Sequence, residues 1–225
     1  MNVRIKINYT KYVEFDENEP DYIRAYTPDC VNDMIKRGRD RGFFVTYNHP
    51  VWTLEEYPVY MSYEGMNAME IYNNCGYVSG YDEYVPAVYD AMLRGGKRLY
   101  CIAADDNHNS IERFFGGYVM IKADKLEYST ITKALCDGNF YSSRGPEIYE
   151  LWVEDGKVYI TCSDAKMIAM VTSRRRTKAV YGQNGKTVTE AVFEVVPEDK
   201  YIRLTVTDVW GNTANTNAYF VDSIL

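Results

Sequence analysis

The chain has 225 residues, of which 46% are hydrophobic and 25% charged, and its formal net charge is −7. This composition is typical of a folded protein rather than a disordered one, and the negative charge argues against nucleic acid as a main partner. No apolar run reaches membrane-spanning length, the first ten residues lack the apolar block of a secretion signal, and the five cysteines form no C-x-x-C pair. We therefore expect a cytoplasmic protein with no membrane partner.

Up to about residue 145 the sequence alternates short apolar runs with helical patterns. The apolar runs, each a candidate strand, are residues 42–48, 66–73, 97–104 and 116–123. A helix is expected to begin after Thr27, a good N-cap, and to stop at Gly42. Two further helical patterns end at Gly95 and at Gly138. Alternation of this kind predicts β-α-β units and a parallel sheet or barrel.

From about residue 146 the pattern changes to consecutive short strands. Asp155-Gly156 and Asn184-Gly185 are residue pairs that favour the tight turns of β-hairpins, and a third turn is expected around Gly211. Roughly 80 residues of this pattern predict a small antiparallel β-sandwich. The expected organisation is an α/β portion over residues 1–145, followed by a β-sandwich over residues 146–225.

The chain has only two histidines, and each closely follows a predicted strand of the first portion. Residues i and i+2 of an extended backbone point to the same side, so Asp106 and His108 are expected to face one site. The carboxyl ends of the strands carry the chemistry in α/β barrels. Imidazole nitrogen and carboxylate oxygen suit zinc, manganese or iron better than calcium. His49, Asp106 and His108 are therefore candidate ligands of a divalent metal.

Three other residues are candidates for supporting roles, and each has an ordinary alternative. Glu70, in the second apolar run, is either a metal-site carboxylate or a buried acid in an ion pair. Asp105 either orients a metal ligand or is a solvated loop acid. Arg144 either binds a substrate phosphate bidentately or pairs with an acid where the two portions meet.

The stretches GFFVTYNHP, MNAMEIYN, CIAADDNHN and DGNFYSSRGPEI resemble the later half of the PHP (polymerase and histidinol phosphatase) superfamily of metal-dependent phosphoesterases. The resemblance covers about residues 20–150. It implies a distorted β/α barrel with metals at its C-terminal rim, and it implies that His49, Asp106 and His108 are ligands. The strand-rich tail resembles the β-sandwich appendages of some members, including relatives that hydrolyse esters and carbamates.

The chain departs from the family at its amino-terminal side. Complete members open with an H-x-H motif, and this chain has no third histidine. The resemblance therefore implies a partial, N-terminally incomplete barrel that holds one metal at best. An open barrel exposes strand edges, so we expect self-association or a partner that completes it.

Three functions stay open on these grounds. The first is a phosphoesterase that uses manganese, zinc or iron on small phosphate esters. The second keeps the metal but acts on carboxylic or carbamic esters. The third is a non-catalytic half-barrel with a binding or assembly role.

Overall fold

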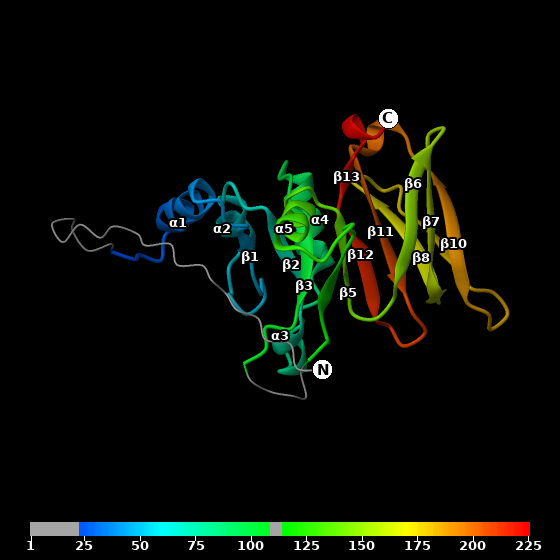
Figure 1. Ribbon diagram of the computed structural model, residues 1–225, viewed down its shortest axis with the longest axis horizontal. Coiled ribbons are helices and arrows are strands. Elements are labelled where there is room, and N and C mark those ends of the chain that lie inside the picture. Colours follow the sequence, from blue (N-terminus) through cyan, green and yellow to red (C-terminus); the bar gives the residue numbers. More distant parts are fainter. Residues whose placement is uncertain (1–22, 109–113) are drawn as a thin grey trace.

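The computed structural model describes residues 23–108 and 114–225. These residues form helices and a small parallel sheet at one end of the molecule and two antiparallel sheets at the other, so the fold is mixed α/β with more strand than helix (Figure 1). The strands in this part of the chain close no barrel. No helix within it is both long enough and apolar enough to cross a membrane.

The parallel sheet has three strands, in the order β1-β2-β3. They are β1 (Thr46–Tyr47), β2 (Ala68–Asn73) and β3 (Tyr100–Ala104). The middle strand, β2, is buried along its whole length, as expected for a parallel strand covered on both faces. The prediction of parallel strands is confirmed for the first three apolar runs.

The fourth apolar run does not join this sheet, so that part of the prediction is wrong. It forms β4 (Tyr118–Ile121), which pairs antiparallel with β5 (Phe140–Ser143) in a different sheet. The physical reason is that an apolar run marks a buried strand but carries no information about the direction of its neighbour.

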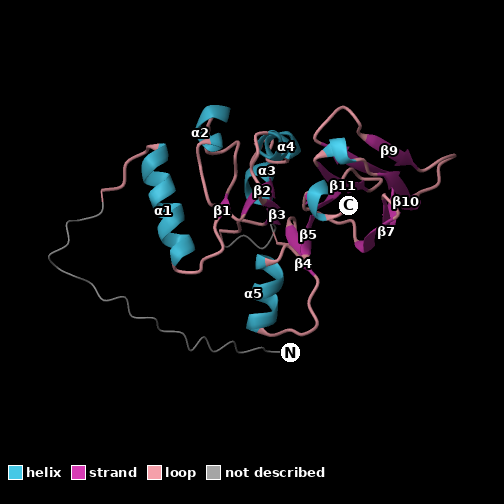
Figure 2. Ribbon diagram, turned by 90° about the horizontal axis from the view of Figure 1, so that it is seen from above, coloured by secondary structure: helices cyan, strands magenta, loops and turns pink. Residues whose placement is uncertain are grey.

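Helices pack beside the parallel sheet and beside β4, and those predicted from the sequence are present. The helices are α1 (Pro28–Asp40), α2 (Tyr57–Met61), α3 (Asn74–Val78), α4 (Pro86–Arg94) and α5 (Tyr128–Cys136). Helix α1 begins where expected, because the Thr27 hydroxyl accepts the backbone N–H of Cys30 at 3.3 Å. Figure 2 shows α1 at the end of the molecule farthest from the antiparallel sheets and α5 below β4. The core between helices and sheet includes Tyr89, Met92 and Ile71.

The two antiparallel sheets face each other across a second apolar core. One has seven strands, in the order β4-β5-β12-β11-β8-β9 with β13 beside β11, and the other has the order β10-β7-β6. Strands not yet given are β6 (Ile148–Glu154), β7 (Lys157–Ala165), β8 (Met167–Thr172), β9 (Lys178–Tyr181), β10 (Val188–Glu194), β11 (Tyr201–Thr207), β12 (Thr213–Thr216) and β13 (Tyr219–Phe220). Two short 3-10 helices, Pro197–Asp199 and Val221–Ser223, also lie in the described part of the chain. Buried side chains from both sheets, such as Ile160 and Leu204, share the core.

The predicted turns form, but one of them joins different strands than expected. Asp155 and Gly156, with φ of 48° and 71°, close the hairpin between the paired strands β6 and β7. Asn184 and Gly185 also take positive φ. Yet β9 pairs with β8 and β10 pairs with β7, so this turn connects the two sheets and the hairpin prediction is wrong. An Asn-Gly pair sets the local backbone, whereas the pairing partners are set by the rest of the sheet.

The seven-stranded sheet takes strands from both sides of residue 145, because β5 pairs with β12. The side chain of Asn217 is one of those that link this sheet to the parallel sheet. Asn217 accepts the backbone N–H of Cys101 in β3 at 2.9 Å and donates to the carbonyls of Gly138 and Phe140 at 3.0 and 2.9 Å. An open barrel was expected to expose strand edges, but part of the β3 edge is occupied by this chain's own Asn217.

Candidate functional site

The candidate site lies at the carboxyl ends of the three parallel strands. His49 is two residues beyond β1, Asn73 is the last residue of β2, and Asp106 is two residues beyond β3. Because the strands are parallel and adjacent, these three exits share one edge of the sheet. This is the location where open and closed α/β sheets place their chemistry.

Glu70 and Asn73 connect the three strand exits through hydrogen bonds. The Glu70 carboxylate is only 3% exposed, and its Oε2 accepts the backbone N–H of His49 at 2.7 Å and the Asn73 side-chain amide at 2.9 Å. The same Asn73 amide donates to Asp106 Oδ2 at 3.1 Å. Asn73 was missed from the sequence, although a polar side chain at the exit of a fully buried strand was the signal that marked it.

His49 and Asp106 both have an unusual backbone conformation. Their φ values are 34° and 48°, in a region that few residues other than glycine adopt. Such conformations persist when surrounding contacts hold them, and they gather at functional sites. Here the hydrogen bonds from His49 N–H to Glu70 and from Asn73 to Asp106 supply those contacts.

The imidazole of His49 packs against an aromatic side chain. Its ring lies edge-on to Trp52, with centroids 4.9 Å apart. Its Nδ1 is buried and has no hydrogen-bond partner among the described residues. Burying a polar nitrogen without a hydrogen bond costs free energy of folding, and a bound ligand would offset that cost. His49 Nδ1 is therefore the atom of this edge with the clearest need for a ligand.

Asp106 and His108 form the pair that the D-x-H spacing predicts. His108 Nε2 lies 3.3 Å from Asp106 Oδ1, and the side chains are 79% and 37% exposed. An ion pair this exposed contributes little to stability. Their exposure leaves both side chains accessible to a ligand, although Asp106 Oδ2 also accepts the Asn73 amide.

The candidate ligands match a divalent metal in type and location but do not form a complete set. The residues that the structure describes contain no group of three or more His, Cys, Asp or Glu side chains arranged to hold a metal ion. His49 offers one nitrogen at the end of β1, and Asp106 with His108 offers an oxygen and a nitrogen beyond β3. The structure brings the predicted ligands to one edge without closing a metal site around them.

Burial gives Glu70 an unusual proton affinity. Desolvation raises the pKa of this carboxyl above its ordinary value, while the hydrogen bonds from Asn73 and His49 oppose the rise and the nearby Asp106 adds to it. Glu70 therefore retains a proton more readily than an exposed glutamate does.

Two other acids of this region bind loop backbone instead of presenting their oxygens to a ligand. Asp105 accepts the N–H groups of Phe115, Gly116 and Gly117 at 2.6, 2.7 and 2.9 Å, so it orders the loop rather than standing in solvent. Glu83 is fully buried and accepts the N–H of Trp52 at 2.6 Å, which fixes the turn after His49. Glu83 was missed because it precedes a helix, far from any predicted strand end.

Among the described residues, Arg144 makes no ion pair of the kind that was one of its two expected roles. It has no carboxylate partner in residues 23–108 and 114–225, and its guanidinium instead lies 4.0 Å above the ring of Tyr72. Because Tyr72 is part of β2, this contact places Arg144 next to the parallel sheet. The alternative role, contact with an anionic ligand, stays a prediction.

Comparison with protein-family models, curated proteins and solved structures gave no match to this chain.

Proposed function

We propose that this chain is a metal-dependent hydrolase of the PHP type that acts on small phosphate esters, with His49, Asp106 and His108 as ligands of one divalent ion. The observation that carries the proposal is the buried, unpartnered Nδ1 of His49 on the same sheet edge as the exposed Asp106–His108 pair. A bound manganese, zinc or iron ion would supply Lewis-acid activation of water and of the ester oxygens.

The chain's own residues position these ligands. Glu70 fixes the backbone of His49, and Asn73 ties Glu70 to Asp106, so a shift of one strand exit moves the others. Because three ligands leave coordination positions open, water, substrate or a second polypeptide would fill the rest. We therefore also propose that the chain self-associates or binds a partner that completes the barrel.

A second candidate function is a non-catalytic half-barrel with a binding or assembly role. The observation in its favour is that Glu70, Glu83 and Asp105 all use carboxylate oxygens to bind backbone N–H groups. A carboxylate whose oxygens accept backbone N–H groups has fewer lone pairs left to bind a metal or to transfer a proton.

The test compares hydrolysis of para-nitrophenyl phosphate and para-nitrophenyl acetate by the full chain with manganese, zinc or iron added. Metal-stimulated cleavage of the phosphate ester, lost in both His49→Ala and His108→Ala, supports the phosphoesterase. Cleavage of the acetate alone, with the same losses, supports the ester hydrolase instead. No metal-dependent cleavage of either substrate contradicts both and favours the half-barrel without catalysis.

A further inference from the structure

Arg144 is the residue that directly follows β5, and its guanidinium lies among three tyrosine rings. The Arg144 Cζ is 4.0 Å from the ring centroid of Tyr72, 4.4 Å from that of Tyr77 and 5.8 Å from that of Tyr84. We call these three rings the tyrosine cage. Stacking on aromatic faces holds a guanidinium in one plane and leaves its edge free to donate hydrogen bonds.

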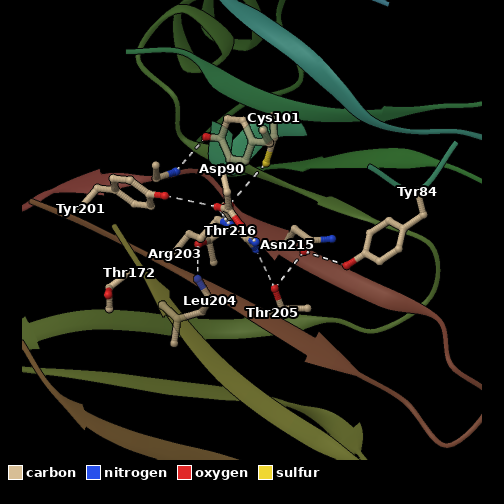
Figure 3. Close-up of polar contacts among 12 residues, drawn as sticks. Tyr84, Asp90, Cys101, Thr172, Tyr201, Arg203, Leu204, Thr205, Asn215 and Thr216 are labelled. Carbon is tan, nitrogen blue, oxygen red and sulfur yellow. Dashed lines mark hydrogen bonds and ion pairs between the residues drawn. The ribbon is translucent and has the colours of Figure 1, made fainter. Parts of the chain in front are cut away.

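The tyrosine cage and the arginine are fixed from several elements. Tyr72 OH donates to Asn74 at 2.8 Å. Tyr84 OH donates to Asn215 at 3.3 Å, as Figure 3 shows. The backbone N–H of Arg144 donates to the carbonyl of Thr213 at 3.0 Å. The guanidinium is therefore positioned before any ligand arrives, which lowers the entropy cost of binding.

Two other arginines in similar surroundings each pair with an aspartate, whereas Arg144 has no such partner in the described residues. Arg98 also stacks on an aromatic ring, 4.2 Å from Phe220, but it pairs with Asp222. Arg203 is buried, and its Nε and Nη2 both donate to the carboxylate of Asp90. Arg144 is half-buried, yet within the described residues no carboxylate pairs with it, and its Nε is buried without a hydrogen-bond partner.

A guanidinium with no carboxylate partner among the described residues favours the binding of an anion at this position. The rings offset only part of the cost of removing the guanidinium from water, and a buried charged N–H without an acceptor adds to that cost. The cage is open to solvent at Tyr77, which is 41% exposed, so a small ligand has access.

We propose that Arg144 and the tyrosine cage form a binding site for a small oxyanion, the phosphate or carboxylate group of a small molecule. The planar guanidinium fork matches two oxygens of such a group, and the rings exclude water from the contact. This site uses none of the candidate metal ligands and does not depend on the proposed hydrolase activity.

The test is calorimetric titration of the full chain with inorganic phosphate, acetate or chloride at matched ionic strength, with a chelator present to exclude metal binding. Saturable binding of phosphate or acetate, but not chloride, is expected for the wild type, and the stronger of the two identifies the ligand class. Arg144→Gln should weaken that binding about tenfold or more, because it removes charge-assisted hydrogen bonds. Arg98→Gln, which removes the paired arginine over Phe220, should bind as the wild type does.

Absence of saturable oxyanion binding, or unchanged binding by Arg144→Gln, would overturn the proposal. If Arg144→Gln fails to unfold cooperatively, Arg144→Lys decides the matter. Lysine keeps the charge but lacks the fork, so weaker binding supports the site and unchanged binding overturns it.

Discussion

The buried ion pair between Asp90 and Arg203 joins α4 to β11 and gives the sharpest prediction about stability. Arg203 Nε and Nη2 donate to the two carboxylate oxygens of Asp90, both at 2.7 Å, and Nη1 donates to Thr205 at 2.9 Å (Figure 3). The side chains are only 4% and 12% exposed, so solvent screens the pair weakly. Substitution of Asp90 by Ala leaves the guanidinium buried without its anion.

The expected cost of Asp90→Ala is about 3–5 kcal/mol in the free energy of unfolding, because an uncompensated buried charge is the expensive outcome. Replacing both partners, as in Asp90→Leu with Arg203→Met, removes the charge as well as the bond. The double variant should therefore be more stable than Asp90→Ala alone.

Urea unfolding of the wild type and variants, followed by circular dichroism, measures these free energies. The matched control is Asp40→Ala, which breaks the exposed pair with Lys36 on α1 and should cost about 0.5 kcal/mol or less. A loss below about 1 kcal/mol for Asp90→Ala, or a double variant no more stable than that single one, would refute the reasoning.

Two further predictions concern the candidate site. Burial raises the pKa of Glu70 in the folded state, so the contribution of Glu70 to stability should decrease as pH rises above about 4.5. In urea unfolding at each pH, the stability of Glu70→Gln relative to the wild type should therefore increase with pH; a difference between the two proteins that does not change with pH would show that Glu70 makes no such contribution. Asp105→Ala should destabilise by about 2 kcal/mol and speed amide exchange at Phe115, Gly116 and Gly117, since all three N–H groups lose their acceptor. Unchanged exchange at these three amides would contradict the loop-ordering role of Asp105.

The sequence predicted local structure well where a residue's own chemistry decides it. Thr27 caps α1 through its hydroxyl, and Asp155-Gly156 closes a hairpin because both residues take positive φ. These features depend on the residue and its immediate neighbours. Turns and helix caps can therefore be predicted from the sequence alone.

Pairing between distant segments could not be predicted in the same way. The run that forms β4 is as apolar as its predecessors, yet it pairs with β5 because contacts between sheets, rather than its own residues, choose the partner. For the same reason the Asn184-Gly185 turn links two sheets instead of two paired strands.

The sequence marked the candidate ligands and two supporting residues, Glu70 and Asp105, but not Asn73 or Glu83. His49, Asp106 and His108 stood out because each follows an apolar run, and the structure places all three beyond parallel strands. Glu83 acts through a hydrogen bond to Trp52, far away in the sequence, which no local pattern reports. Asn73 did have a local signal, its place at the end of an apolar run, but its bond to Asp106 is equally distant in the sequence.

The most direct test of the proposed function is the metal content of the purified chain and of its His108→Ala variant, by elemental mass spectrometry after incubation with manganese, zinc or iron. We expect near-stoichiometric metal in the wild type and its loss in the variant, with both proteins unfolding at similar urea concentrations because His108 is largely exposed. Wild-type protein that stays free of metal after incubation with each of these ions would contradict the proposed metal site.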